Sequence, residues 1–202
     1  MKVLVACEYS GKVRDAFIAQ GHEAMSCDIL DTDVQGPHYK GDVRDVINDG
    51  WDLMVAHPPC TYLSNSGVRW LSSDASRWPK MFEAAAFFKE LLEAPISRIC
   101  IENPVMHKYG KQLIGSNQTQ CVQPWMFGHP ESKATCLWLK GLPKLVETDN
   151  VKEDMKKLSK KEQNRIHHMS PGKDRWKKRS ETFQGIANAM ASQWGSKTTE
   201  GK

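Results

Sequence analysis

Apolar runs of strand length alternate with helical patterns through the first hundred residues, and this alternation limits the possible folds more than any other feature. Residues 11–21 have apolar residues at helical spacing and end in Gly21, and residues 76–95 form the strongest helical pattern. Strand-like runs cover residues 2–7, 22–29, 51–59 and 97–103. The alternation predicts right-handed crossovers and an α/β fold with a doubly wound, mainly parallel sheet.

The second half of the chain is less regular. Residues 119–143 read as two strands around a Gly-His-Pro turn, and residues 180–195 as an amphipathic helix that Ser180 caps. We expect a single domain over residues 1–195, with a basic insert at about 150–180 and a flexible tail over 196–202.

Composition excludes several classes of protein. A chain of 202 residues can bury one core, it has no run of eighteen apolar residues, and its first residues lack a signal-peptide pattern. We therefore expect a cytoplasmic protein with no membrane contact. The six cysteines stand singly, with no C-x-x-C pair, so neither a metal site nor a disulfide framework is predicted.

Positive charge is concentrated in one segment. Residues 152–179 hold eleven Lys or Arg and four Asp or Glu, a local charge of +7, and because the whole chain carries +4 the remainder carries −3. A basic segment on a mildly acidic body predicts an anionic partner such as nucleic acid. The alternative is a solvated loop without a partner.

Polar residues follow each predicted strand. In a doubly wound sheet, ligands bind outside the carboxyl ends of the strands, so these residues are expected to line one cleft. They are Glu8, Ser10, Asp28, Asp42, His57, Cys60, Glu102 and Asn103.

Cys60 and Glu102 are the residues best suited to chemistry. Two prolines, Pro58 and Pro59, stiffen the chain before Cys60, and Glu102 ends the next strand. A thiolate and a carboxylic acid on neighbouring strand ends suit addition to an electron-poor ring such as a pyrimidine. Partial burial is expected to raise the pKa of Glu102, so that the acid donates to ring nitrogen three while the thiolate adds at carbon six. Carbon five then becomes nucleophilic.

These motifs resemble those of the S-adenosylmethionine-dependent DNA (cytosine-5) methyltransferases. The family's proline-cysteine motif is similar to Pro58-Pro59-Cys60, and its glutamate-asparagine motif to Glu102-Asn103-Pro104, in the right order and 42 residues apart. The resemblance implies a Rossmann-like methyltransferase fold, catalytic roles for Cys60 and Glu102, and substrate contacts from Pro59, Asn103 and Pro104.

Two further stretches resemble later motifs of the family. Residues 127–135 are similar to its strand-turn motif, with Lys133 and Thr135 where two arginines would face the base, and residues 182–191 to its last motif. The resemblance therefore implies substrate contacts from Lys133 and Thr135.

The cofactor half of the resemblance rests on fewer residues. S-adenosyl-L-methionine is the implied cofactor, with its methionine end near Ser10 and Gly11 at the start of the first helix. Asp28 would accept hydrogen bonds from the ribose hydroxyls, and Asp42 matches the motif that touches adenine. Glu8 and His57, on the same rim, are assigned to this cofactor site; His57 could instead only pack the loop.

One family element is missing, and this leaves the function open. Only residues 134–181 separate the strand-turn motif from the last motif, too few for an independent target-recognition domain. The substrate is then cytosine in DNA, with a protein partner supplying target recognition if one is needed, or a free pyrimidine nucleotide. A third reading is a non-catalytic relative that binds nucleic acid or protein. An amino-methyltransferase fits less well, because residues 57–60 lack that family's first amide or acid and its aromatic residue.

Short chains of this kind suggest a bacteriophage origin, which would place the protein in the host cytoplasm.

Overall fold

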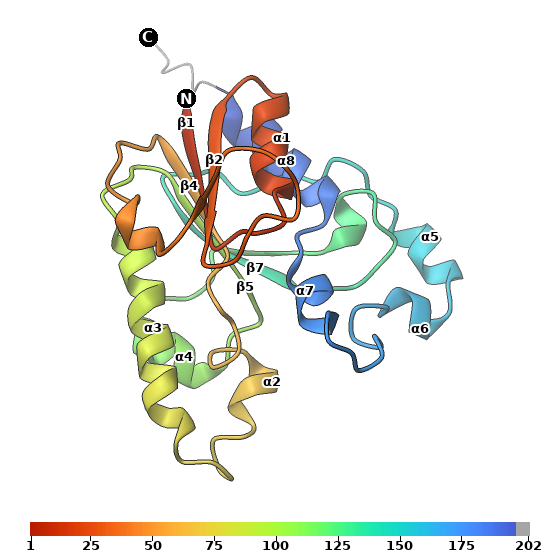
Figure 1. Ribbon diagram of the computed structural model, residues 1–202. Coiled ribbons are helices and arrows are strands. Elements are labelled where there is room, and N and C mark those ends of the chain that lie inside the picture. The colour runs from red at the N-terminus through yellow and green to blue at the C-terminus, as the bar shows by residue number, and fades with distance from the viewer. Residues whose placement is uncertain (197–202) are drawn as a thin grey trace.

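A seven-stranded sheet forms the centre of the computed structural model, which describes residues 1–196 (Figure 1). Its strands stand in the order β3-β2-β1-β4-β5-β7-β6. Their bounds are β1 Lys2–Ala6, β2 Glu23–Asp28, β3 His38–Lys40, β4 Leu53–Ala56, β5 Ile99–Pro104, β6 Gln120–Val122 and β7 Thr135–Lys140. Every pair among β1 to β5 is parallel, whereas β7 runs antiparallel to both β5 and β6. The predicted doubly wound, mainly parallel α/β sheet is confirmed.

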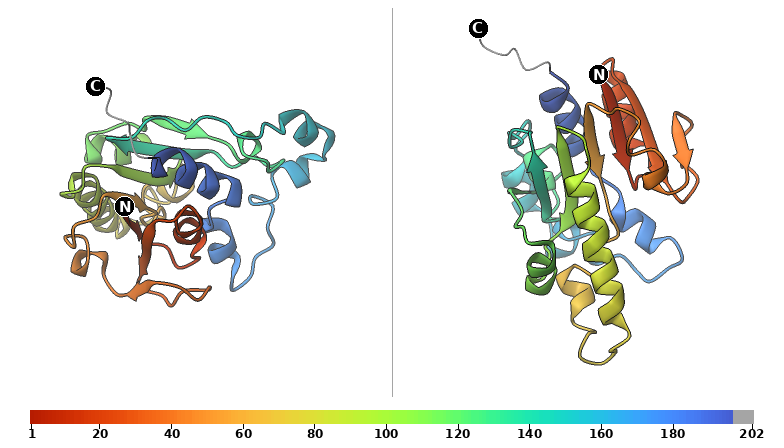
Figure 2. Two further views of the ribbon diagram at one scale, coloured as in Figure 1. Left: turned by 90° about the horizontal axis from the view of Figure 1, so that it is seen from above. Right: turned by 90° about the vertical axis from the view of Figure 1, so that its left-hand side faces the viewer.

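Helices cover both faces of this sheet. The α-helices are α1 Lys12–Ala19, α2 Asn65–Val68, α3 Arg77–Glu93, α4 Lys108–Ile114, α5 Lys152–Lys157, α6 Lys160–Gln163, α7 Arg175–Ser180 and α8 Gln184–Gly195. Two short 3₁₀ helices, η1 Val43–Asp45 and η2 Pro124–Met126, lie between strands. Helices α1 and α8 pack on one face, and α3 lies along the other (Figure 2).

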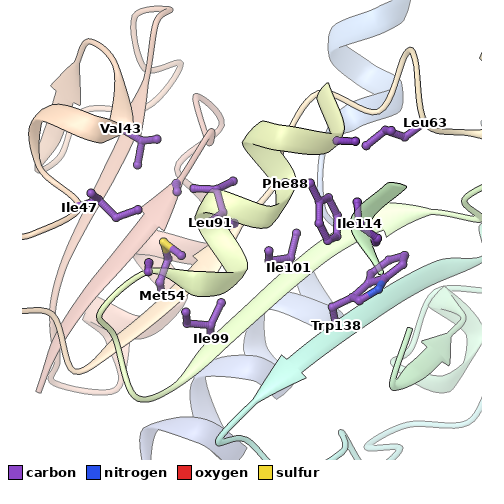
Figure 3. Packing of buried hydrophobic residues seen from close by; sticks show 14 of the residues in the cluster. Val43, Ile47, Met54, Leu63, Phe88, Leu91, Ile99, Ile101, Ile114 and Trp138 are labelled. Carbon is purple, nitrogen blue, oxygen red and sulfur yellow. The ribbon is translucent and has the colours of Figure 1, made fainter. Parts of the chain in front are cut away.

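The core on the α3 face explains why that helix forms where it does. Met81, Ala85, Phe88 and Leu91 recur at helical spacing and are all buried. Figure 3 shows Phe88 and Leu91 pointing from α3 onto residues of the sheet, with the Phe88 ring edge-on to Trp138 at 5.1 Å between centroids. This packing holds β4 and β5 side by side.

The order of the strands fixes where a ligand can bind. From β1 the chain moves outward to β2 and β3, then returns to place β4 on the other side of β1. The crevice outside the carboxyl ends of β1 and β4 is therefore the switch point of the sheet, where doubly wound folds bind their ligands.

Some local predictions were wrong. The helix α8 begins after Phe183, and Ser180 belongs to α7, where its hydroxyl lies 2.8 Å from that of Tyr9 instead of capping α8. The short edge strand β3 was not expected, because three residues carry too little periodicity to be recognised. Of the predicted tail, residues 197–202 lie outside the described residues.

The basic insert carries the three short helices α5, α6 and α7. Among residues 1–196, no helix is long and apolar enough to cross a membrane.

Candidate functional site

Cys60 lies on a tight turn directly after β4. The Cys60 carbonyl accepts hydrogen bonds from the amides of Leu63, at 3.1 Å, and Ser64, at 3.0 Å, so the chain reverses immediately beyond the thiol. The preceding Pro58 and Pro59 fix their own backbone φ angles and keep the chain extended up to that turn. Cys60 is partly exposed. The sequence thus places a thiol on a rigid support at the carboxyl end of a buried strand.

Glu102 lies on the adjacent strand β5 and is only 8% exposed. The Nδ1 atom of His57 lies 2.9 Å from the Glu102 Oε2 atom, and both side chains are buried. Ala56 at the end of β4 pairs with Ile101 in β5, so the next residues along the two chains, His57 and Glu102, lie side by side. The structure therefore places His57 against Glu102, a contact that sequence reasoning did not predict.

The His57 contact changes the expected protonation of Glu102. Burial raises the pKa of Glu102, but the hydrogen bond and positive charge of His57, together with Lys133, outweigh burial and lower the pKa below its usual value. The prediction that burial keeps Glu102 protonated near neutral pH was wrong for the protein without substrate, because that prediction considered burial and left out the hydrogen bond with His57. The resting pair carries an ionised Glu102.

The pKa of the Cys60 thiol is shifted in the opposite direction to that of Glu102. Burial, followed by the negative charge of Glu102, raises the pKa of Cys60, while the positive charges of Lys133 and Arg179 act against this rise. Resting Cys60 is therefore protonated at neutral pH. The resting site holds its proton on sulfur and a negative charge on the neighbouring carboxylate.

Two buried polar atoms near this pair have no partner among the described residues. They are the Nε2 atom of His57 and the Oδ1 atom of Asn103; the Asn103 amide nitrogen donates to the Pro58 carbonyl at 3.4 Å. Buried polar atoms are nearly always hydrogen-bonded in native proteins. The unsatisfied atoms leave the site one ring nitrogen and one amide oxygen with which to bind a ligand.

Lys133 and Thr135, the residues of the predicted strand-turn motif, lie near the carboxyl end of β5. Thr135 pairs with Pro104 in the β5–β7 register, which brings the start of β7 beside the end of β5. The Lys133 amine donates to the Glu181 carbonyl at 3.1 Å and lies 5.8 Å from the centre of the Phe183 ring. A shallow crevice that is too narrow to hold a water molecule lies here, lined by Glu102, Lys133, Thr135, Thr182, Phe183 and Ile186.

Arg179 joins this site from the end of α7, and sequence reasoning missed it. Its positive charge acts against the rise in the pKa of Cys60, after the larger effects of burial and Glu102. The sequence signal was the basic segment itself, but periodicity could not show which of its eleven cations turns inward. The site thus gathers Cys60, Glu102, His57, Lys133 and Arg179.

The start of α1, where a cofactor carboxylate was expected, is already occupied. The buried Glu8 carboxylate accepts hydrogen bonds from the amides of Val13, at 2.7 Å, and Arg14, at 3.2 Å, and from the Ser10 hydroxyl at 3.2 Å. Glu8 therefore satisfies the donors and the positive end of the α1 dipole from within the chain. A second carboxylate cannot use the same two amides.

Gly11 has a local explanation that needs no cofactor. Its φ angle is +72°, and an added Cβ would lie 2.5 Å from the buried guanidinium of Arg14. That guanidinium donates to the hydroxyls of Ser26, at 3.2 Å, and Thr32, at 3.3 Å, and so ties α1 to the loop after β2. Gly11 makes room for Arg14.

Asp28 and Asp42 flank the carboxyl ends of β1 and β2. Asp28 is half-buried and accepts a hydrogen bond from the Leu30 amide at 2.9 Å, and burial raises its pKa. Asp42 is exposed, caps η1 through the Arg44 amide at 2.9 Å and forms an ion pair with the Arg44 side chain. Both carboxylates raise the pKa of Cys7 by their charge, so both lie near the end of β1. These two carboxylate acceptors suit a diol such as ribose.

Comparison with known proteins gives distant likenesses. No protein-family model matches the chain, and no curated protein matches it in sequence. The solved structures that are similar in shape include the following three. One is a protein named as a DNA modification methyltransferase encoded within a prophage (E. coli), with 16% identity, a TM-score of 0.44, and coverage of 69% of this chain and 46% of that one.

The second is the Entamoeba histolytica methyltransferase EhMeth, with 14% identity, a TM-score of 0.48, and coverage of 74% of this chain and 57% of that one. The third is the S. pombe Dnmt2 methyltransferase, with 13% identity, a TM-score of 0.43, and coverage of 80% and 56%. The matched part spans about half the length of these neighbours, and likeness this distant does not identify a function.

Proposed function

We propose that this protein transfers a methyl group from S-adenosyl-L-methionine to carbon five of cytosine in DNA, through a covalent adduct of Cys60 with the base. The proposal is supported by the position of Cys60 just beyond β4 and of Glu102 on the adjacent parallel strand β5, where His57 bonds to the carboxylate and the charge of Glu102 acts on the thiol. An acid next to a nucleophile at the switch edge of the sheet is the arrangement that addition to a pyrimidine needs.

The resting protonation states define the first step. The proton lies on the Cys60 sulfur, and the reaction needs it on ring nitrogen three. Glu102 accepts this proton, with His57 holding the carboxylate in place, and donates it to ring nitrogen three as the sulfur bonds to ring carbon six. The electron pair of the carbon five–carbon six double bond is then available at carbon five, so atoms and charges balance within the site.

Lys133 and Arg179 support this step electrostatically. Both favour the thiolate over the thiol, so their charges stabilise sulfur as its proton leaves. After methylation, a base removes the proton from carbon five. Cys60 then leaves as the double bond re-forms, and the proton on ring nitrogen three returns through Glu102 to the sulfur.

The cofactor site fits this chain in part. Asp28 and Asp42 supply acceptors for the ribose and adenine half, whereas the amides at the start of α1 are bound to Glu8 and cannot hold the methionine carboxylate. Lys12 is a cation at the start of α1, and it would have to leave its 2.7 Å ion pair with Glu181 to bind that carboxylate. When bound, the sulfonium supplies an electrophilic methyl group.

Methylation of a free pyrimidine nucleotide is the second candidate. It is favoured by the short segment between Thr135 and Thr182, which holds three helices of four to six residues and no independent recognition domain. A non-catalytic relative that binds nucleic acid or protein is the third. A protein partner that supplies target recognition, a phage origin and a cytoplasmic location remain predictions.

Incubation with methyl-labelled S-adenosyl-L-methionine separates these functions. Duplex DNA, single-stranded DNA and deoxycytidine monophosphate are supplied in parallel, and products are digested to nucleosides and identified by mass spectrometry. We expect 5-methyldeoxycytidine from DNA and none from the Cys60→Ser variant. Label in the free nucleotide alone would favour the second candidate, and no label in any substrate, with intact cofactor binding, would contradict the proposal.

A further inference from the structure

An open groove of about 590 Å³ lies beside the proposed catalytic site, on the side where α2, α3 and α4 begin. Its lining includes Arg69 after α2, Trp78 at the start of α3, and Lys108 and Tyr109 at the start of α4. These elements come together at one end of the molecule (Figure 1).

The groove presents aromatic rings to solvent. Trp78 is 36% exposed and Tyr109 37% exposed, and their ring centres lie 5.7 Å apart. Trp70, two residues after α2, and Phe82, on α3, are each about half exposed. Large aromatic side chains normally bury most of their surface, so several exposed together indicate a binding surface.

Positive charge surrounds these rings. The Lys108 amine lies 5.3 Å from the centre of the Tyr109 ring, and the Arg69 guanidinium 4.8 Å from that of Trp70. Residues 65–80 and 105–111 contain five Lys or Arg and a single acidic residue, Asp74. None of the five is in an ion pair within residues 1–196. Aromatic rings that alternate with free cations provide stacking surfaces for bases and contacts for phosphates.

The groove is tied to the proposed catalytic site by the backbone. The Leu63 carbonyl accepts from the His107 amide at 2.9 Å, and the Val105 carbonyl from the Asn65 amide at 3.3 Å. The segments that follow Cys60 and Glu102 therefore pair with each other before they enter the groove. Asn65, at the groove edge, is five residues from Cys60, which limits their separation to about 17 Å.

We propose that this groove binds a single-stranded stretch of polynucleotide next to the base held at Cys60, with bases stacked on Trp78 and Tyr109 and phosphates contacted by Arg69 and Lys108. The inference rests on the proposed function for the identity of that base, and it selects a polymer over a free nucleotide as substrate. A free nucleotide has no neighbouring bases to stack in the groove.

Binding of a fluorescently labelled single-stranded DNA 12-mer, followed by anisotropy without cofactor, tests the groove separately from catalysis. Stacking contributes about 1–3 kcal/mol per base, so Trp78→Ala and Tyr109→Ala should each weaken binding at least ~5-fold. Tyr109→Phe keeps the ring and should bind like the parent. Lys108→Ala should reduce the slope of log affinity against log salt by about 0.7, the value for one phosphate of a single strand.

The matched control is Lys144→Ala, which removes an exposed lysine outside the groove and outside the basic segment. Circular dichroism and thermal melting check that each variant is folded. The proposal is overturned if Trp78→Ala and Tyr109→Ala bind like the parent, or if polyglutamate at equal charge displaces the DNA as well as unlabelled DNA does. A parent that binds the 12-mer through these residues but methylates nothing would refute the proposed function and leave the groove standing.

Discussion

Removal of His57 should destabilise the protein in a strongly pH-dependent way, because His57 is what keeps buried Glu102 ionised. In the parent, the lowered pKa of Glu102 stabilises the folded state above the pKa of the unfolded chain, and this stability is lost as pH falls through the folded value. In His57→Ala, burial acts with less opposition and raises the folded pKa of Glu102. That variant is then most stable below the unfolded pKa, and it loses stability as pH rises.

The magnitude follows from the burial of the pair. Both side chains are about nine-tenths buried, and breaking such a pair by removing one partner costs about 3–5 kcal/mol while the other stays charged. At acid pH Glu102 takes up a proton and becomes neutral, so part of this destabilisation is absent there. The difference in unfolding free energy between parent and variant should therefore be larger at pH 7.5, where it approaches this cost, than at pH 4.5.

Urea denaturation at a series of pH values measures this difference. The matched background is Glu102→Gln, which keeps the shape of the side chain but cannot ionise, and the double variant His57→Ala with Glu102→Gln completes the cycle. The His57–Glu102 coupling energy should rise with pH. A coupling energy that is the same at pH 4.5 and 7.5 would refute the reasoning and make His57 a residue that only packs the loop.

Three further predictions concern single residues. Glu102→Gln should lower turnover by about 10²–10⁴-fold with substrate binding little changed, in a comparison of kcat with Kd; equal loss of both would contradict a role in proton transfer. Alkylation of Cys60 by iodoacetamide should be slow at neutral pH, and its rate should rise through the alkaline range because the pKa of the thiol is raised. The reaction should be faster in Glu102→Gln, which lacks the neighbouring negative charge. A fast, pH-independent reaction in the parent would instead show a resting thiolate. Asp28→Ala should weaken S-adenosyl-L-methionine binding in calorimetry by about 1.5–3 kcal/mol for each hydrogen bond lost, and unchanged affinity would remove Asp28 from the cofactor site.

The sheet was predictable from sequence because its signals are local. Four buried apolar runs and two helical patterns define β1, β2, β4, β5, α1 and α3 with no knowledge of tertiary contacts. The rule that ligands bind at carboxyl ends of parallel strands then brings Cys60 and Glu102 together, since β4 and β5 are neighbours.

The electrostatics of the site were not predictable in the same way. The contact between His57 and Glu102 depends on the register of two strands 45 residues apart, and it reverses the expected pKa shift of Glu102. Glu8 likewise read as a rim residue, but in the folded chain its carboxylate caps α1. Arg179 could not be picked out of eleven similar cations until the packing of α7 was known.

Covalent trapping on DNA tests the central claim most directly. The protein is incubated with S-adenosyl-L-methionine and DNA that contains 5-fluorocytosine, in which fluorine at carbon five blocks the final proton removal, and the product is analysed by intact and peptide mass spectrometry. We expect a protein–DNA adduct located at the peptide containing Cys60, and no adduct with Cys60→Ser. Transfer of methyl groups to DNA with no trapped adduct, or with an adduct on another residue, would contradict the role given to Cys60.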